Sequence, residues 1–112
     1  MRNWLIILAV GILLSAYPIS AADLSMAYAY PVPFKPSEGH RQIVFTNLAS
    51  ECTIKVFAPS GSLVTTMTEA SGTGQHIWDV KNDGGEAVAD GAYYYLVQSE
   101  NDKQIGKLVI IR

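Results

Sequence analysis

The sequence is poor in cysteine, and this limits how the chain can be stabilised. Cys52 is its only cysteine, so no disulfide can form within the chain. Small domains often need disulfides because their cores are small, and this domain must therefore be held by packing. Cys52 is most simply a small buried apolar residue. A reactive thiol is the alternative, but no cation adjacent in the sequence would lower its pKa.

Basic residues are also few. Once the first 22 residues are set aside, seven Lys and Arg stand against ten Asp and Glu, which gives a net charge near −3. Nucleic acids and anionic membranes select clustered basic residues. The composition therefore predicts that nucleic acid is not a partner.

Patterns that indicate catalysis or tight metal binding are missing. His40 and His76 have no cysteine or carboxylate at ligand spacing, which favours surface or strand-edge positions for both. Ser60 and Ser62 flank a turn glycine, but no G-x-S-x-G elbow surrounds a nucleophile. We therefore predict a protein that is not an enzyme, with no catalytic residue, no cofactor and no metal site.

The N-terminus has the three-part layout of a secretory signal peptide. A short positive start precedes an apolar run at residues 4–14, and Ser20 and Ala22 satisfy the small-x-small rule for cleavage. The run is shorter than the about 20 residues of a membrane-spanning helix. We predict a signal peptide at residues 1–22, with cleavage after Ala21 as an alternative and an uncleaved anchor as the competing interpretation. The mature protein would have no stable membrane span and would be periplasmic, cell-surface or extracellular.

The remaining residues, about 90, suffice for one domain, and their hydrophobic pattern has a period of two. Ile43 alternates with Phe45, and Ile54 with Val56, as in half-buried strands. Further strand-like runs follow, separated by clusters of Gly, Pro, Asn, Asp and Ser that are typical of turns. No stretch has a helical period. The pattern predicts an all-β fold, an antiparallel β-sandwich of about seven short strands, with a small closed barrel as the alternative.

Two turns and one strand glycine can be predicted in detail. The "PSGS" segment at 59–62 reads as a tight turn in which Gly61 takes a positive φ. The "ENDK" segment at 100–103 joins the last two strands into a hairpin. Gly106 inside the last strand indicates a bulge or a close backbone approach.

The segment before the first clear strand contains Pro31, Pro33 and Pro36. Proline cannot donate to a β ladder, so this segment is expected to be an edge strand or an extended lead-in. We therefore divide the mature chain into a lead-in at 23–38 and a sandwich at 39–112. The P-x-x-P spacing also fits ligands of proline-binding modules.

The acidic, glycine-rich stretch after Trp78 is the best candidate for an ion site. An EF-hand calcium loop has Gly at its sixth position, and placing that Gly on Gly84 puts Asp79 first, Lys81 third and Asp83 fifth. A lysine at a ligand position opposes a divalent ion. A turn is the preferred interpretation, in which Asp79 accepts backbone N–H bonds. Calcium or ligand binding by the 79–85 loop is kept as an alternative.

The aromatic residues are expected to divide between core and surface. Trp78 should pack in the core. Side chains alternate along a strand, so Tyr93, Tyr95 and Val97 should face inward and Tyr94 should face solvent or a partner. The "DGAY" segment resembles the tyrosine corner of Ig-like sandwiches, in which the Tyr93 hydroxyl would bond to the connection before its strand.

Four segments in order resemble one family. They are "YPVPFKP" at 30–36, "CTIKVFAPSGSLV" at 52–64, "WDVKNDGGEAVADGAYYYLV" at 78–97 and "GKLVIIR" at 106–112. The chain resembles the Ig-like domain named after the flagellar hook-capping protein FlgD, and is similar to the C-terminal sorting domains of type IX secretion cargo. The resemblance implies an Ig-like sandwich over the whole mature chain.

Two positions depart from the family pattern. Val32 stands where Asn is usual between the prolines, and Val80 stands where Gly is usual after the Trp-Asp pair. Both lie at connections, so the fold should be unchanged. The module normally ends a long protein, whereas here it follows the expected signal peptide directly. We therefore do not expect a flagellar scaffolding role.

These observations predict an exported, non-enzymatic Ig-like module with a structural or protein-interaction role. Its partner would be an unidentified protein of the secretion machinery or the cell envelope, contacted through Tyr94 and the proline-rich edge. One alternative is a sorting or attachment domain recognised by a type IX-like secretion system. Another is a small calcium- or ligand-binding domain that uses the 79–85 loop.

Overall fold

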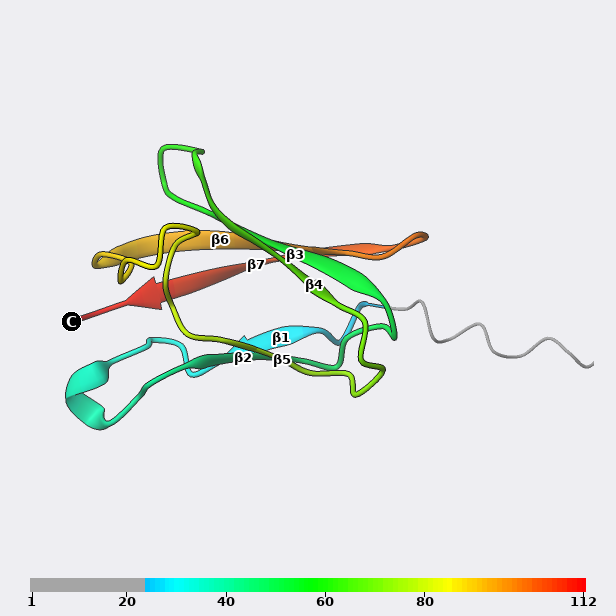
Figure 1. Ribbon diagram of the computed structural model, residues 1–112, viewed down its shortest axis with the longest axis horizontal. Coiled ribbons are helices and arrows are strands. Elements are labelled where there is room, and N and C mark those ends of the chain that lie inside the picture. The colour runs from blue at the N-terminus through cyan, green and yellow to red at the C-terminus, as the bar shows by residue number, and fades with distance from the viewer. Residues whose placement is uncertain (1–23) are drawn as a thin grey trace, which may run out of the picture.

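The computed structural model describes residues 24–112, so the expected signal peptide at 1–22 lies outside the described residues. The described chain forms two layers of strands (Figure 1). The elements are β1 (Tyr28–Tyr30), the 3-10 helix η2 (Pro36–Glu38), β2 (Ile43–Thr46), β3 (Cys52–Phe57), β4 (Leu63–Glu69), β5 (His76–Trp78), β6 (Gly91–Gln98) and β7 (Lys103–Ile110). Within residues 24–112, no helix is long and apolar enough to cross a membrane.

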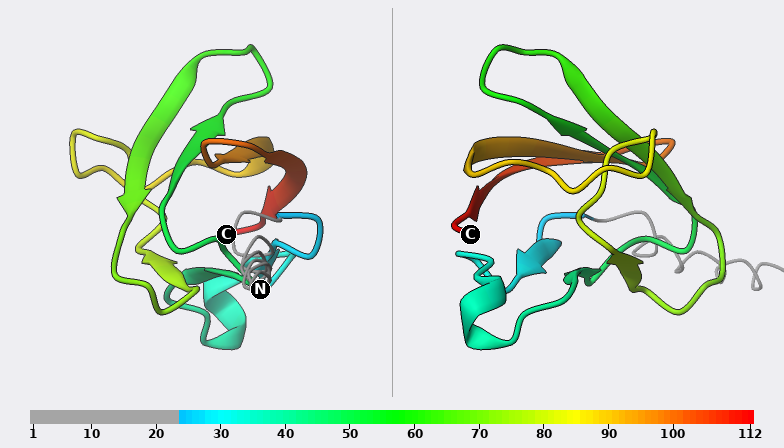
Figure 2. Two further views of the ribbon diagram at one scale, coloured as in Figure 1. Left: turned by 90° about the vertical axis from the view of Figure 1, so that its right-hand side faces the viewer. Right: turned by 60° about the vertical axis from the view of Figure 1, so that its left-hand side comes forward.

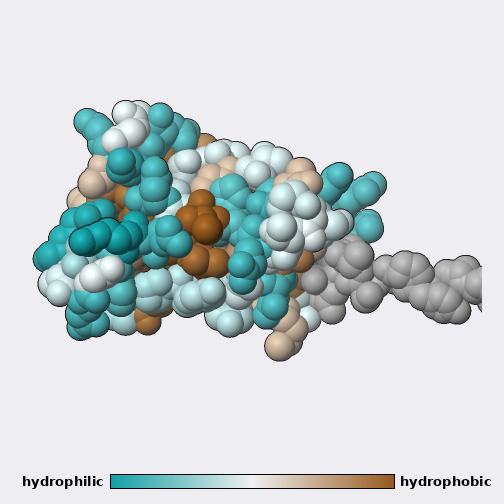
Figure 3. All heavy atoms as spheres, turned by 60° about the horizontal axis from the view of Figure 1, so that its bottom comes forward, coloured by the Kyte–Doolittle hydropathy of each residue, from teal (hydrophilic) through white to brown (hydrophobic). Residues whose placement is uncertain are grey.

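The strands form two antiparallel sheets that face each other (Figure 2). One sheet has the order β1-β2-β5 and the other has the order β4-β3-β6-β7. Figure 3 turns the outer face of the three-stranded sheet towards the viewer. The predicted antiparallel sandwich is confirmed. The closed barrel was wrong, because the two sheets have separate hydrogen-bond ladders.

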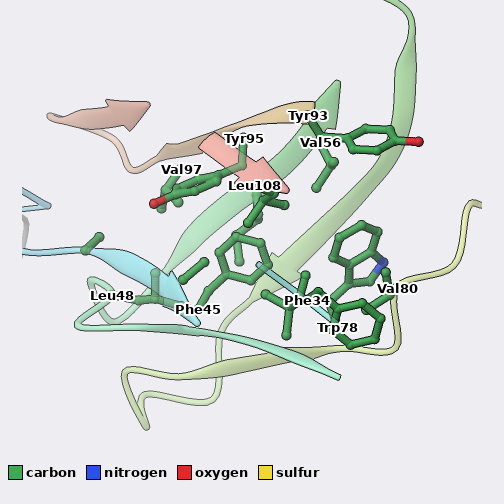
Figure 4. Close-up of a cluster of buried hydrophobic side chains, with 14 of the residues drawn as sticks. Phe34, Phe45, Leu48, Val56, Trp78, Val80, Tyr93, Tyr95, Val97 and Leu108 are labelled. Atoms are coloured by element: carbon green, nitrogen blue, oxygen red, sulfur yellow. The ribbon is translucent and has the colours of Figure 1, made fainter. Parts of the chain in front are cut away.

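The core lies between the two sheets and follows the period of two that the sequence shows. Ile54 and Val56 on β3 are fully buried, and Lys55 between them points outward. Phe45 of one sheet meets Tyr95 of the other edge-on, with ring centroids 5.2 Å apart (Figure 4). Burying a side chain of this kind contributes about 1.5–3 kcal/mol. Cys52 is part of this core, as predicted, and its burial raises the pKa of the thiol, with a smaller effect from the nearby Glu69 carboxylate.

Both predicted hairpin turns are present. The β3–β4 turn is closed by the Ala58 N–H, which donates to the Ser62 carbonyl at 2.9 Å. Gly61 in this turn has the expected positive φ, 93°. In the β6–β7 hairpin, Gly106 lies directly opposite Tyr95, whose ring fills the space where a Cβ of residue 106 would stand. Gly106 therefore provides a close approach and not a bulge.

The proline-containing segment connects the two sheets along one side. β1 is an edge strand of the three-stranded sheet, and after the prolines Phe34 forms a parallel bridge with Ile110 at the end of β7. The Phe34 N–H donates to the Val109 carbonyl at 2.7 Å, and the Ile111 N–H donates to the Phe34 carbonyl at 2.9 Å. Residues 24–38 also contribute buried side chains to the common core, namely Leu24, Ala27, Ala29 and Phe34.

Candidate functional site

The 79–85 loop is a turn held by its own asparagine. The Asn82 amide oxygen accepts hydrogen bonds from the backbone N–H groups of Gly84 and Glu86, both at 2.9 Å. The Asn82 N–H donates to the Glu86 carbonyl at 2.9 Å. The turn was predicted correctly, but the side chain that accepts the backbone N–H groups is Asn82 and not Asp79. Asn82 can accept these hydrogen bonds because it begins the turn, and its short side chain reaches the N–H groups of the residues that follow it.

Asp83 connects this loop to the four-stranded sheet. Its Oδ1 atom accepts a hydrogen bond from the hydroxyl of Thr65 on β4 at 2.6 Å. Thr65 is one of the few buried polar residues, so Asp83 satisfies a group that would otherwise lack a partner. In the part of the chain that the structure describes, no three His, Cys, Asp or Glu side chains gather as a metal site would require. The calcium hypothesis therefore rests on the sequence pattern alone.

Trp78 packs in the core, as predicted, and the backbone just after it is strained. The Trp78 indole N–H donates to the Lys81 carbonyl at 2.9 Å. Between them Val80 has φ 62° and a side chain that is only 1% exposed (Figure 4). A left-handed conformation costs a residue with a Cβ about 1–2 kcal/mol, and it is unusual for a β-branched residue. This strain falls at the position after the Trp-Asp pair, where the family pattern described above usually has Gly.

The three consecutive tyrosines divide as predicted. The Tyr93 hydroxyl donates to the Ala89 carbonyl at 2.7 Å, in the connection before its strand, which is a tyrosine corner. Tyr95 and Val97 are buried, whereas Tyr94 is 47% exposed on the outer face. Burial raises the pKa of the Tyr95 hydroxyl.

A polar cluster that sequence reasoning missed joins the open edges of the two sheets. Glu69 at the end of β4 is 5% exposed, and one of its carboxylate oxygens lies 2.9 Å from Nδ1 of His76 on β5. The other oxygen accepts the Ser71 hydroxyl in a short hydrogen bond and the Ser71 N–H at 2.9 Å. The Ser71 hydroxyl, followed by His76, holds the pKa of the Glu69 carboxyl below its usual range.

This cluster is structural in its geometry. A nucleophilic serine needs the imidazole between itself and the carboxylate, whereas here Glu69 stands between Ser71 and His76. The carboxylate therefore cannot help the imidazole to take a proton from Ser71. The cluster instead joins β4 of one sheet to β5 of the other, so His76 is the strand-edge residue that was predicted, with an added partner.

The second histidine and the turn serines also have structural partners. The His40 Nδ1 accepts the Lys35 N–H at 2.8 Å, and the ring centroid lies 6.1 Å from that of Phe34. The hydroxyls of Ser60 and Ser62 lie 3.0 Å apart in the β3–β4 turn. These contacts are local, which agrees with the surface or strand-edge position predicted for His40 and with the turn predicted around Ser60 and Ser62.

A groove of 520 Å³ lies between the start of β4 and the loop at 82–89. Leu63 and Tyr93 form part of its apolar wall, and Asn82 and Asp83 supply polar atoms. Both polar side chains are already hydrogen-bonded within the protein. The groove wall therefore combines apolar and polar surface in similar shares.

The outer face of the four-stranded sheet carries two adjacent rows of apolar side chains. Leu63, Phe57 and Tyr94 lie side by side on β4, β3 and β6. In the adjacent row, Leu96 on β6 is paired with Ile105 on β7. Leu63, Tyr94 and Ile105 are 51%, 47% and 66% exposed. Large contiguous apolar areas on a small soluble domain mark contact sites.

The outer face of the three-stranded sheet has an apolar row of its own. Tyr30, Val44 and Ile77 are aligned across β1, β2 and β5, and the Tyr28 ring lies 5.9 Å from that of Tyr30. Figure 3 shows hydrophobic residues gathered near the middle of this face. The described molecule thus has a filled interior and two outer faces with apolar centres.

Comparisons with known proteins agree with this architecture. Residues 34–103 match the FlgD Ig-like domain. PorZ of Porphyromonas gingivalis, described as an essential bacterial surface component of the type-IX secretion system, matches with TM-score 0.71 at 24% identity, over 85% of this chain and 13% of PorZ. Dimeric latent PorU from Porphyromonas gingivalis matches with TM-score 0.54 at 17% identity, over 76% of this chain and 9% of PorU. No curated protein matches the chain. The chain therefore spans a small part of each solved structure, and these likenesses show a shared fold.

Proposed function

Because the chain belongs to the FlgD Ig-like domain family, we propose that it is an exported, non-enzymatic β-sandwich that acts by contacting another protein. The observation that carries this proposal is the exposed apolar area on the outer face of the four-stranded sheet, where Leu63, Tyr94 and Ile105 are about half exposed or more. The inner faces are already filled by the core, which favours binding at the surface over binding in an enclosed site.

The proposed location is outside the inner membrane, in the periplasm, at the cell surface or in the medium. The layout of residues 1–22 supports export. The likeness to a part of PorZ, which is described as a bacterial surface component, supports a partner in the secretion machinery or the cell envelope.

The second candidate is a sorting or attachment domain that a type IX-like secretion system recognises. The observation that favours it is the fold match at TM-score 0.71 to a component of that system. On this hypothesis the domain is a label that is recognised and then removed or modified. The two candidates therefore predict different fates for the C-terminus.

Both candidates can be tested by fractionating the source cells and measuring the intact mass of the protein in each fraction. A mass matching Asp23–Arg112, in the periplasm, at the surface or in the medium, supports an interaction module with a cleaved signal peptide. A surface species that is trimmed or modified at its C-terminus supports the sorting domain. A full-length mass in the membrane fraction would contradict cleavage, and a full-length mass in the cytoplasm would contradict export altogether.

A further inference from the structure

Three lysines lie among and beside the apolar side chains on the outer face of the four-stranded sheet. Lys107 on β7 ends the row that contains Tyr94, Lys55 on β3 lies beside Leu96 in the adjacent row, and Lys103 stands at the start of β7. Lys55 and Lys107 adjoin buried core residues along their strands, and Lys103 has the same alternation as Lys107, so all three point outward. Three of the five lysines of the chain are thus on one face.

Acidic side chains are absent from this face of the described strands. Glu69 is the only Asp or Glu within the seven strands, and it points inward at the edge of the sandwich. The other acidic residues lie in turns and loops. A chain with a net negative charge therefore presents a positively charged, partly apolar sheet face.

Protection of the sheet edge explains only part of this arrangement. Lysines on an edge strand prevent pairing with other chains, and Lys103 and Lys107 lie on the edge strand β7. Lys55 lies on β3, which is paired on both sides by β4 and β6. A lysine on an internal strand does not protect an edge, so its position requires another reason.

We propose that this face, defined by Leu63, Phe57, Tyr94, Leu96 and Ile105 with Lys55, Lys103 and Lys107, docks an acidic surface of a partner protein that has an apolar centre. The proposal rests on the proposed function and specifies its surface and the chemistry of its partner. The apolar rows supply the buried centre of the contact, Lys103 and Lys107 supply a charged rim, and Lys55 adds a charge beside the apolar rows. Such a rim selects partners by charge and accelerates association.

A second copy of the chain is a poor occupant of this face. A symmetric dimer brings the same patch of both copies together, which would gather the three lysines of each copy in one contact to which the strands contribute no outward acidic side chain. Juxtaposed like charges weaken association. Charge complementarity therefore favours a different, acidic protein.

The experiment uses the mature protein, Asp23 to Arg112, with the photoreactive residue p-benzoylphenylalanine at position 94. The matched control carries the same residue at position 28, because Tyr28 is equally exposed, 50% against 47%, on the opposite outer face. Each protein is irradiated with an envelope extract of the source cells, and the cross-linked peptides are identified by mass spectrometry. The proposal predicts adducts at position 94, in acidic segments of one partner, at about ten times the yield at position 28.

The charge requirement is tested in the position-94 protein with Lys55→Glu/Lys107→Glu. We expect the adduct yield to fall at least about tenfold, because each lysine would be replaced by a repelling charge. Arg41→Glu/Lys81→Glu changes the net charge equally at exposed sites off this face and should leave the yield within about twofold. Melting curves are measured first. If the double glutamate variant is unfolded, Lys55→Gln/Lys107→Gln replaces it, with an expected loss of about threefold.

Several results would overturn the proposal. The adduct yield at position 94 could be zero or equal to that at position 28. The adducts could form with lipid, between two copies of the chain, or with partner segments that lack acidic residues. The yield could also stay unchanged when Lys55 and Lys107 are replaced by glutamate. If any of these occurs while intact Asp23–Arg112 is found outside the inner membrane, the interaction module survives and its contact surface lies elsewhere. A full-length protein retained in the cytoplasm would instead refute the proposed function.

Discussion

The strained backbone at Val80 predicts that the usual advantage of Ala over Gly is lost at this position. Val80 is buried, 1% exposed, and has φ 62°. In ordinary backbone, Gly is less stable than Ala at the same position by about 0.5–1 kcal/mol, because its unfolded chain has more freedom. At Val80 we expect this difference to disappear, so that Val80→Gly is about as stable as Val80→Ala.

The size of the effect follows from three contributions. Both substitutions remove buried methyl groups from Val80, which costs about 0.8 kcal/mol per carbon and more if a cavity remains. Ala keeps the Cβ and therefore keeps the left-handed strain of about 1–2 kcal/mol, whereas Gly removes it. Gly has an entropic cost of about 0.5–1 kcal/mol and loses one more buried carbon than Ala, about 0.8 kcal/mol. These two costs offset the removed strain, so Val80→Gly and Val80→Ala should agree to within about 1 kcal/mol. Both variants remain less stable than the native protein, because the buried side chain is lost.

Val56 provides the matched control. It is the same residue type, is fully buried, and lies within regular strand β3. There Val56→Gly should be less stable than Val56→Ala by at least about 0.5 kcal/mol. The four variants are compared by urea unfolding monitored by tryptophan fluorescence, with the free energy of unfolding taken from the midpoints at a common slope.

The decisive quantity is the change in the Gly-minus-Ala difference between the two positions. A difference at Val80 that favours Gly by about 1–2 kcal/mol more than at Val56 supports backbone strain after Trp78. An equal advantage of Ala at both positions would refute the argument and show that packing alone determines the tolerance of residue 80.

Three further predictions follow from the contacts of single side chains. Gly106→Ala should lower the free energy of unfolding by about 1–3 kcal/mol, because its methyl group would overlap a tyrosine ring, and thermal unfolding measures this loss; an unchanged melting temperature would contradict the close packing. Tyr93→Phe should cost about 1 kcal/mol by removing the corner hydrogen bond, which is about 4–8 °C in melting temperature for a domain of this size, whereas Tyr94→Phe should have almost no effect. The folded-state pKa of Glu69 is lowered, so the stability it contributes is present above its unfolded pKa of about 4.3 and is lost as the pH falls through the lower folded value. Urea unfolding between about pH 5 and pH 3 should therefore show a shallower loss of stability for Glu69→Gln than for the native protein, and parallel curves would contradict the assignment.

The sequence predicted the features that depend on strand alternation and nearby neighbours. Alternation assigned Tyr93, Tyr95 and Val97 to the core and Tyr94 to the surface, because side chains on a strand can only alternate. The tyrosine corner was predictable because its donor and acceptor, Tyr93 and Ala89, are four residues apart.

The features that were missed depend on how distant segments meet. Glu69 is the last residue of β4 in one sheet, and His76 is the first residue of β5 in the other. Only the packing of the two sheets brings them together. One signal was present: Cys52 pairs with Glu69 across β3 and β4, so an inward cysteine implies an inward glutamate that needs a partner. The sequence pattern did not show that Asn82, and not Asp79, accepts the backbone hydrogen bonds of the turn, because this depends on which residue begins the turn.

The contacts that hold the two sheets together leave both outer faces free. One side of the sandwich is joined by the Phe34 backbone hydrogen bonds to the end of β7, and the other by the contact of Glu69 with His76. Neither uses an outward-facing strand residue, and the remaining stability comes from the inner faces. Stability and binding therefore depend on separate sets of residues. Reversing the charges of Lys55 and Lys107 should accordingly reduce cross-linking to a partner while leaving the melting temperature nearly unchanged.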